Sequence, residues 1–387
     1  MKTHPFHLLA KPTGAACNLA CKYCYYSSKS ELYPNSNFRM SDEILESYIR
    51  QYIDSQPGPV VEFAWQGGEP TLMGLDFYRR AVALTEQYKK PGMRIQHTIQ
   101  TNGTRLDDEW CAFFKEHNFL VGISIDGPRE LHDAYRVNKG GKGTFNRVMQ
   151  GLEMLKFYDV DFNILCSVHA ANGDYPLDVY RFFRDVIGAR YIQFIPIVER
   201  IREQVTDRSV KAVQYGEFLT AVFGEWFMQQ DDIPKGDDMG HVSVQIIDVA
   251  LGALAEQPDG LCVFSPTCGN ALAIEHNGDV FSCDHFVDKA HWHYLGDINR
   301  MTLTAMAASD EQRKFGRNKL YTLPQYCLDC DVRFICHGGC PKNRFINTPS
   351  GDAGLNYLCD GYKMFFGHIS GIIQQIVTSL PQKEATG

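Results

Sequence analysis

Three cysteines near the start of the chain have the type and spacing needed for redox metal chemistry. Cys17, Cys21 and Cys24 lie in C-N-L-A-C-K-Y-C, a C-x3-C-x2-C pattern with an aromatic residue before the last cysteine. Three thiolates on one short loop can ligate three irons of a cubic 4Fe–4S cluster, which four cysteines usually hold. The fourth iron is then open to a ligand from outside the protein, as in other metal sites that bind substrates. The alternatives are a zinc site that lacks one ligand, or cysteines that only pack.

A second block of eight cysteines lies in the last third of the chain. Its spacing is C-x5-C-x14-C, followed by C-x2-C-x5-C-x3-C-x18-C. Eight cysteines make two complete sets of four, and a fully ligated cubic cluster transfers electrons instead of binding substrate. Zinc is an equally good alternative on spacing alone, because C-x2-C pairs also form structural zinc sites. The eight residues are Cys262, Cys268, Cys283, Cys327, Cys330, Cys336, Cys340 and Cys359.

The composition is that of an ordinary globular protein. The chain has 387 residues, of which 44% are hydrophobic and 22% are charged. Its 38 basic and 46 acidic residues give a formal charge of -8, so we expect neither nucleic acid nor an anionic membrane as a partner. The N-terminal residues lack the apolar core of a signal peptide, and no stretch approaches the ~20 apolar residues of a membrane span. These features predict a cytoplasmic protein.

The cytoplasm is reducing, so the thirteen cysteines are not expected to form disulfides. Eleven of them belong to the two blocks described above. The remaining two, Cys111 and Cys166, fall on an expected helix and inside an expected strand, and we expect both to be small buried residues.

The elements that must position the first three cysteines form an α/β pattern. Short β-rich runs alternate with amphipathic stretches up to about residue 200, which predicts a parallel sheet. Each expected strand ends in a loop rich in Gly, Asn, Asp or Pro, where parallel α/β folds carry their ligand sites. The six strands favour a partial (β/α)6 barrel. They are expected at His7–Lys11, Val60–Trp65, Arg94–Gln100, Leu120–Ile125, Asp161–Val168 and Tyr191–Pro196.

A polar segment at 231–240, D-D-I-P-K-G-D-D-M-G, marks the expected domain boundary. It follows a helix expected at Tyr215–Gln229. We therefore place a barrel domain at residues 1–235 and a cysteine-rich domain at residues 236–387.

The cysteine loop resembles that of the radical S-adenosylmethionine (radical SAM) enzymes at every defining position. The loop Gln66-Gly67-Gly68-Glu69-Pro70 follows an expected strand and matches their G-G-E-P loop. In these enzymes the methionyl amine and carboxylate of the cofactor chelate the open iron. The resemblance implies that Gly68 allows a close backbone approach to the cofactor and that Glu69 meets its ammonium group.

Other loop residues are then candidates for the rest of S-adenosylmethionine. Ser124 and Asp126 close a strand in S-I-D-G-P and are candidates for ribose or methionyl contacts. Arg136 can pair with the cofactor carboxylate in a charge-assisted fork. Val198, after the sixth strand, can pack on adenine, and Tyr23 is expected to serve adenine through its backbone.

The C-terminal cysteine block resembles the SPASM domain, the twin-cluster extension of peptide-modifying radical SAM enzymes. In that family the two ligand sets interleave along the chain, a feature that spacing alone does not predict. The resemblance implies three 4Fe–4S clusters in all, two of them auxiliary. Auxiliary cluster I then takes Cys262, Cys268, Cys283 and Cys340, and auxiliary cluster II takes Cys327, Cys330, Cys336 and Cys359.

Further segments are similar to the anaerobic sulfatase-maturating enzymes, from about residue 5 to residue 370. These segments include A-K-P-T-G-A-A-C-N-L-A-C-K-Y-C-Y-Y, W-Q-G-G-E-P-T, Q-T-N-G-T, G-I-S-I-D-G-P, N-G-D-V-F-S-C-D-H-F and C-P-K-N-R-F. The resemblance implies oxidation of one Cys or Ser of a sulfatase, in a C/S-x-P/A-x-R motif, to Cα-formylglycine. A 5′-deoxyadenosyl radical removes a Cβ hydrogen, the auxiliary clusters accept the next electron, and Asp284 accepts the proton. An external donor such as flavodoxin or ferredoxin supplies electrons.

Two other functions remain open on the sequence. A SPASM-type maturase that forms thioether or carbon–carbon crosslinks in a ribosomal peptide shares both cysteine blocks. A zinc-stabilised binding module without catalysis is the alternative from a different class, and iron and sulfide analysis distinguishes it from either enzyme.

Overall fold

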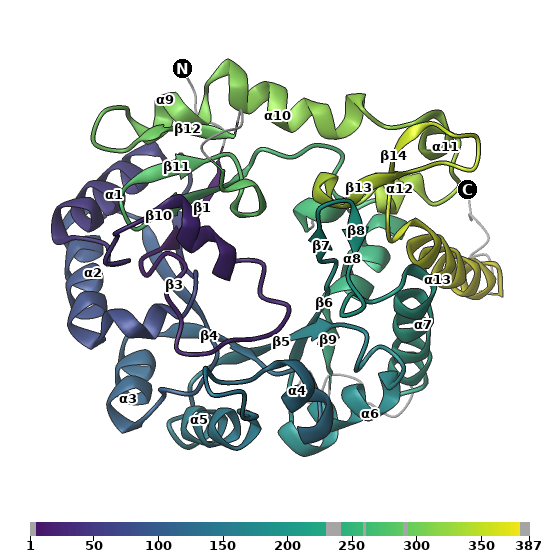
Figure 1. Ribbon diagram of the computed structural model, residues 1–387, viewed down its shortest axis with the longest axis horizontal. Coiled ribbons are helices and arrows are strands. Elements are labelled where there is room, and N and C mark those ends of the chain that lie inside the picture. The colour runs from purple at the N-terminus through teal and green to yellow at the C-terminus, as the bar shows by residue number, and fades with distance from the viewer. Residues whose placement is uncertain (1–4, 230–240, 258–260, 289–292, 380–387) are drawn as a thin grey trace, which may run out of the picture.

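A curved sheet with six consecutive parallel strands forms the centre of the protein (Figure 1). The computed structural model describes residues 5–229, 241–257, 261–288 and 293–379. All six expected strands are present, and each bound lies within one residue of the expected position. They are β1 (His7–Lys11), β2 (Val60–Trp65), β3 (Arg94–Thr101), β4 (Phe119–Ser124), β5 (Phe162–Val168) and β6 (Tyr191–Pro196). Each strand pairs in parallel with the next one along the chain, which confirms the partial barrel.

Helices between these strands cover the outer face of the sheet (Figure 1). In the first helix, α1 (Asp42–Ser55), Leu45, Ile49 and Ile53 recur every four residues on one face and are fully buried. Ser41 caps this helix because its side chain accepts a hydrogen bond from the Ile44 N–H. The helix α4 (Arg129–Tyr135) is short, and α6 (Pro176–Arg181) continues into a π-helical turn, η3 (Phe182–Ile187). The other bounds are α2 (Leu75–Tyr88), α3 (Asp108–Glu116), α5 (Phe145–Phe157) and α7 (Ala212–Met228).

The C-terminal region extends the same sheet at both edges, which the sequence did not lead us to expect. At one edge β10 (Ala271–Glu275) pairs in parallel with β1 and is followed by the antiparallel strands β11 (Asp279–Phe281) and β12 (Tyr294–Asp297). At the other edge β9 (Ser243–Val244) pairs in parallel with β6. The sheet therefore has the order β12-β11-β10-β1-β2-β3-β4-β5-β6-β9. The expected domain boundary falls at 230–240, outside the described residues.

The remaining C-terminal elements carry or flank the eight cysteines. The last helix, α13 (Cys359–Ser379), packs on α7, and a Cβ added to Gly361 would lie only 2.1 Å from the carbonyl oxygen of Ala212. These elements are α8 (Gln245–Leu254), η5 (Cys262–Phe264), η6 (Asp284–Phe286), α9 (Leu303–Ala307), α10 (Asp310–Tyr321), α11 (Gln325–Leu328), α12 (Arg333–Cys336), η7 (Pro341–Asn343), β13 (Arg344–Asn347) and β14 (Ala353–Asn356). The barrel half also has η1 (Ser27–Leu32), η2 (Pro70–Met73) and a hairpin of β7 (Arg200–Ile201) and β8 (Gln204–Val205).

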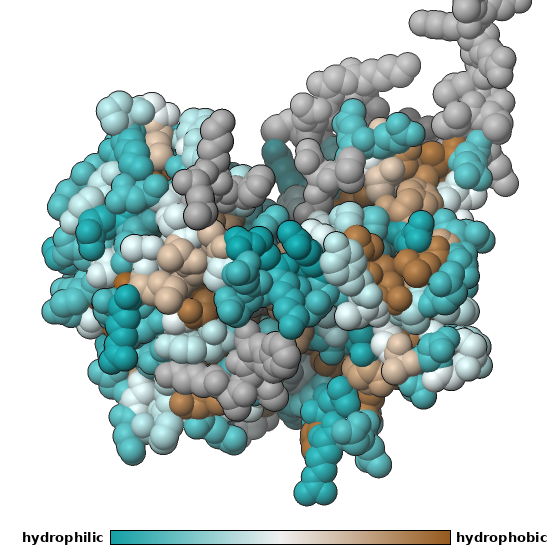
Figure 2. All heavy atoms as spheres, turned by 90° about the horizontal axis from the view of Figure 1, so that it is seen from above, coloured by the Kyte–Doolittle hydropathy of each residue, from teal (hydrophilic) through white to brown (hydrophobic). Residues whose placement is uncertain are grey.

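The surface is mixed in character. Figure 2 shows a face on which hydrophilic side chains predominate and hydrophobic ones form separate patches. Among the described residues, no helix combines the length and apolar character required to cross a membrane.

Candidate functional site

The loop after β1 carries the first three cysteines and is held by the loop after β2. The backbone N–H of Gly68 donates to the carbonyl oxygen of Gly14 (2.8 Å), and that of Glu69 donates to the carbonyl oxygen of Ala16 (2.9 Å). A Cβ added to Gly68 would lie 2.1 Å from the Ala16 oxygen, much closer than any real side chain approaches. The glycine expected to allow a close approach to a ligand thus also allows the two loops to touch.

The loop after β3 holds the cysteine loop from a second side. The Asn102 side-chain amide donates to Oδ1 of Asn18 (2.9 Å) and contacts Sγ of Cys17 (3.8 Å). The Asn18 amide in turn donates to the hydroxyl of Thr104 (2.8 Å). Two strand ends therefore fix the position of the first cysteine.

Glu69 is fully buried and its carboxylate is occupied by protein donors. Oε1 accepts from the backbone N–H of Thr71 (3.0 Å) and from the hydroxyls of Thr71 (2.7 Å) and Thr101 (2.8 Å), and Oε2 accepts from the Asn102 N–H (2.8 Å). Burial raises the pKa of Glu69, and these donors oppose the shift. The side chain joins the loops after β2 and β3, which leaves the loop backbone as the part that can approach a ligand.

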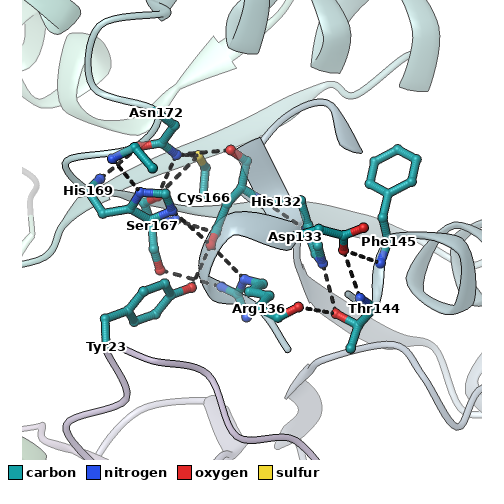
Figure 3. Close-up of polar contacts among 12 residues, drawn as sticks. Tyr23, His132, Asp133, Arg136, Thr144, Phe145, Cys166, Ser167, His169 and Asn172 are labelled. Atoms are coloured by element: carbon teal, nitrogen blue, oxygen red, sulfur yellow. Dashed lines mark hydrogen bonds and ion pairs between the residues drawn. The ribbon is translucent and has the colours of Figure 1, made fainter. Parts of the chain in front are cut away.

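Asp126, after β4, is the centre of a buried polar network. Its Oδ2 accepts from the Tyr23 hydroxyl (2.6 Å) and lies 2.8 Å from Nε of Arg136 and 3.5 Å from Nε2 of His169, while Oδ1 accepts from the Ser167 N–H (2.9 Å). Burial alone would raise the pKa of Asp126, but the Arg136 guanidinium holds it below the usual range. Figure 3 shows Tyr23, Arg136 and His169 directed toward one another.

This network bears on the residues expected to contact a cofactor. Asp126 and Arg136 pair with each other, and the Tyr23 side chain anchors the cysteine loop to them. Ser124, at the end of β4, is buried, and Val198, after β6, is half-buried. Ser124 ends β4, Asp126 and Val198 follow β4 and β6, Tyr23 lies in the loop after β1, and Arg136 is the C-cap of α4.

The cysteine thiols are available for metal. All thirteen cysteines lie in the described residues and none forms a disulfide, as expected. Cys111 and Cys166 are fully buried, which confirms that prediction. Burial raises the pKa of Cys17 to about 11 and that of Cys21 to about 12. Such thiols are protonated at neutral pH until a metal displaces the proton, so an iron–sulfur cluster suits this donor set.

The eight C-terminal cysteines lie in two groups. Cys262 interacts electrostatically with Cys268 and Cys340, and Cys283 interacts with Cys262 and Cys340. We call Cys262, Cys268, Cys283 and Cys340 set I. The second group, which we call set II, lines one pocket and consists of Cys327, Cys330, Cys336 and Cys359.

Ligands of a single metal ion converge more closely than ligands of different irons in one cluster. Among the described residues, no three His, Cys, Asp or Glu side chains converge on one point in a way that would hold a single ion. In a cubic cluster each thiolate binds its own iron, so four cysteines supply the ligands that one cluster needs.

Tyr25 and Asp284 connect the first cysteine loop to set I. Tyr25 directly follows Cys24, Asp284 directly follows Cys283, and the Tyr25 hydroxyl donates to Oδ2 of Asp284 (3.1 Å). Oδ1 of Asp284 lies 3.6 Å from Sγ of Cys283. The candidate base thus lies between the two cysteine groups.

Cations surround Asp284. Nζ of Lys11, a residue only 2% exposed, lies 3.5 Å from Oδ2 of Asp284. Burial alone would raise the pKa of Asp284, but the charges of Lys11 and Lys342 and the Tyr25 hydrogen bond hold it below the usual range. Burial also lowers the pKa of His285 to about 4, so this imidazole is neutral at pH 7. The two lysines therefore keep the carboxylate ionised at neutral pH.

Sequence reasoning missed Tyr25 and Lys11 as parts of this site. Both carried a signal: Tyr25 directly follows a cysteine of the metal loop, and Lys11 is a charged residue at the end of a buried strand. A lysine in such a place needs a partner, because a buried charge is costly without one.

Comparisons with known proteins agree with this geometry. Residues 12–183 match the family model of the radical SAM superfamily, and residues 262–331 match that of the iron–sulfur cluster-binding domain SPASM. A serine-type anaerobic sulfatase-maturating enzyme of Bacteroides thetaiotaomicron is 45% identical over 98% of this chain and 93% of its own length. The chain belongs to the anaerobic sulfatase-maturating enzymes. A cysteine-type member of this family, from Clostridium perfringens, is 34% identical over 94% of this chain and 95% of its own length.

Solved structures of a sulfatase-maturating enzyme share the whole fold. Native anSMEcpe with bound AdoMet has a TM-score of 0.86 and 31% identity, and the match covers 97% of this chain and all of that one. Another structure of that protein contains AdoMet together with the Cp18Cys peptide. The present chain is therefore a radical SAM enzyme that uses S-adenosylmethionine and iron–sulfur clusters.

The close contact of Gly68 with Ala16 yields a testable prediction. Gly68→Ala must move the cysteine loop or the loop after β2, and displacements of about 1 Å cost on the order of 10²-fold in rate. We expect 5′-deoxyadenosine formation to fall by that amount, measured by chromatography under anaerobic conditions. Gly58→Ala is the matched control, because an added Cβ at Gly58 has no heavy atom within 4 Å. An unchanged rate in Gly68→Ala would show that the loops separate without consequence.

Proposed function

We propose that this enzyme oxidises one Ser or Cys side chain of a sulfatase to Cα-formylglycine. The observation that carries the proposal is the hydrogen bond between Tyr25 and Asp284, which joins the first cysteine loop to a carboxylate beside set I. The serine-type and cysteine-type names of the relatives support the same reaction. A Ser-containing sulfatase is the first substrate to test, because the serine-type relatives reach 45% identity and the cysteine-type relatives 34%.

In this proposal eleven of the cysteines hold three 4Fe–4S clusters. Cys17, Cys21 and Cys24 hold the catalytic cluster, and sets I and II hold the auxiliary clusters. When bound, the catalytic cluster and S-adenosylmethionine supply a 5′-deoxyadenosyl radical that removes a hydrogen atom from the target Cβ. The residues proposed to surround S-adenosylmethionine are Tyr23, Gly68, Glu69, Ser124, Asp126, Arg136 and Val198.

In this proposal Glu69 and Asp126 do not contact S-adenosylmethionine through their carboxylates but position the groups that do. The Glu69 carboxylate fixes the G-G-E-P loop, so the loop backbone meets the methionyl ammonium. Asp126 orients Arg136, whose remaining N–H groups are available to the methionyl carboxylate. The close packing of both residues on the cysteine loop supports these roles.

Asp284 receives the proton of the target hydroxyl or thiol in this proposal. A general base must be ionised and within reach of the proton that it removes. Lys11 and Lys342 keep the carboxylate ionised, and the Tyr25 hydrogen bond fixes Oδ2, which leaves Oδ1 to accept the proton. Set I would hold the cluster that accepts the remaining electron, and Asp284 lies beside this set.

The partners follow from the reaction. The substrate is a sulfatase segment with a C/S-x-P/A-x-R motif, and an external one-electron donor such as flavodoxin or ferredoxin reduces the catalytic cluster. We place the reaction in the cytoplasm.

An anaerobic assay with synthetic peptides tests the proposal. The peptides contain S-x-P-x-R or C-x-P-x-R, and mass spectrometry after incubation with S-adenosylmethionine and a reductant reads the product. Formylglycine in the Ser peptide is expected as a loss of two hydrogen atoms that also creates a carbonyl reactive toward hydrazides. A crosslinked peptide without a carbonyl would instead indicate a crosslinking maturase, and 5′-deoxyadenosine without any peptide product would contradict the proposed substrate.

Removal of an auxiliary ligand separates cofactor cleavage from product formation. In Cys283→Ala, from set I, or Cys330→Ala, from set II, the catalytic cluster still has its own ligands, so 5′-deoxyadenosine formation should persist. Formylglycine should be lost, because the electron of the substrate radical has no complete acceptor path. Iron content, 5′-deoxyadenosine and peptide mass are measured on the same sample. Full product yield without the auxiliary cluster would rule out the electron-acceptor role.

A further inference from the structure

A five-residue segment, Cys336-His337-Gly338-Gly339-Cys340, passes directly from set II to set I. Its three central residues all have left-handed backbone conformations, with φ of 44°, 73° and 61°. Three such residues in succession turn the chain sharply, so two cysteines four positions apart join different sets. We call this segment the crossing loop.

Arg344 holds the crossing loop in place. Its guanidinium donates to the carbonyl oxygens of Gly338 (2.9 Å), His337 (2.8 Å) and Gly339 (3.3 Å), and also to that of Lys319. The charge of Arg344 interacts with cysteines of both groups: Cys268 and Cys340 of set I, and Cys327 and Cys336 of set II.

Lys319, in α10, is a second buried cation beside the first. Its side chain is 1% exposed, and Nζ donates to the carbonyl oxygens of Cys262 (2.7 Å) and Val263 (2.8 Å). Its charge interacts with Cys262, Cys268 and Cys340, which all belong to set I. Lys319 is thus specific to one set, whereas Arg344 is shared.

Neither Lys319 nor Arg344 forms an ion pair with any carboxylate in the part of the chain that the structure describes. A buried cation without a counter-charge is costly. The negative groups within reach of these cations are the cysteine sulfurs. A carboxylate neighbours each set, Asp284 beside Cys283 and Asp360 beside Cys359.

We propose that Lys319 raises the reduction potential of the cluster at set I selectively, so that set I is the first acceptor of the electron released by the substrate radical. Arg344 raises the potentials of both clusters and holds the crossing loop between them. The physical reason is that one added electron makes a cluster more negative, and a fixed, poorly screened cation stabilises that reduced form. The substrate radical would lose one electron to set I and its hydroxyl or thiol proton to Asp284, so charge balances. This inference rests on the proposed function, in which the two sets hold clusters.

Redox titration followed by electron paramagnetic resonance tests the inference without measuring catalysis. The titration uses protein in which Cys17, Cys21 and Cys24 are Ala, so that only auxiliary clusters give signals. In this background Lys319→Met should lower one of the two potentials by about 59 mV, a tenfold change in a one-electron equilibrium, and leave the other unchanged. Lys319→Arg, which keeps the positive charge, should have the same two potentials as the protein with Lys319.

Lys363→Met is the matched control. Lys363 is an exposed lysine whose charge interacts with Cys330 and Cys359 of set II, and solvent screens its charge. Neither potential should change in this variant.

Lys319→Gln, which retains one donor for the carbonyl of Cys262, repeats the test where Lys319→Met fails to fold. Unchanged potentials in a neutral variant with full auxiliary iron would overturn the inference and leave the proposed function standing. Loss of set I iron in both neutral variants would show that the Lys319 ammonium has a structural role, and this result would also overturn the inference. Absence of iron and sulfide from both sets in protein with Lys319 intact would instead contradict the proposed function.

Discussion

Replacement of Cys17, Cys21 and Cys24 together by Ala is expected to abolish reductive cleavage of S-adenosylmethionine while about eight irons stay bound, four for each auxiliary cluster. The three thiols are the ligands that the loop after β1 provides, and the eight C-terminal cysteines form their two sets independently of this loop. Iron and sulfide analysis of anaerobically reconstituted protein measures the bound iron. Chromatography of 5′-deoxyadenosine measures the cleavage of S-adenosylmethionine.

Cys111→Ala is a suitable control for the triple variant, because Cys111 is buried in α3. It should keep about twelve irons, the content of three cubic clusters, and normal cofactor cleavage. Continued 5′-deoxyadenosine formation in the triple variant would refute the assignment of the catalytic cluster.

Asp284→Asn is expected to lower formylglycine formation by roughly 10²-fold or more, while cofactor cleavage continues. Asn has the size of Asp and retains hydrogen-bonding capacity, but it cannot accept a proton. The variant should keep its full iron content, because Asp284 is not one of the cysteine ligands. Product mass and 5′-deoxyadenosine are measured in one reaction, so that their ratio gives the uncoupling.

His285 provides the comparison for Asp284→Asn. It is neutral at pH 7, and its buried Nδ1 has no hydrogen-bond partner among the described residues, which makes it the alternative base. His285→Gln should retain most of the product if Asp284 is the base. A near-normal rate in Asp284→Asn combined with a large loss in His285→Gln would transfer the role to His285.

The six central strands could be predicted because each combines a β-rich run with a loop of turn-forming residues. The amphipathic period of segments such as α1 gave the helices that separate them. The strands at the sheet edges were harder to predict from the sequence. β9 has only two residues, and β10 and β11 surround an Asn277-Gly278 turn whose hairpin signal was present but not used.

The cysteines of the site could be predicted from their spacing, but the contacts around them could not. Tyr25 and Asp284 are separated by 259 positions, and no local pattern connects them. The crossing of Cys340 into set I came only from family resemblance, because its physical cause is the backbone of the crossing loop. The occupied carboxylates of Glu69 and Asp126 likewise depend on donors from other loops.

The pairing of β1 with β10 has a consequence for how the protein is made. During synthesis β1 leaves the ribosome first, but its partner at residues 271–275 follows only after more than two thirds of the chain. Until then one edge of the nascent sheet is unpaired, and such edges readily recruit other chains. We therefore expect the loop that follows β1 to take its final position late, so that its iron–sulfur cluster is inserted after translation of the barrel half is complete. A chain truncated at residue 235 should aggregate instead of yielding an independent barrel.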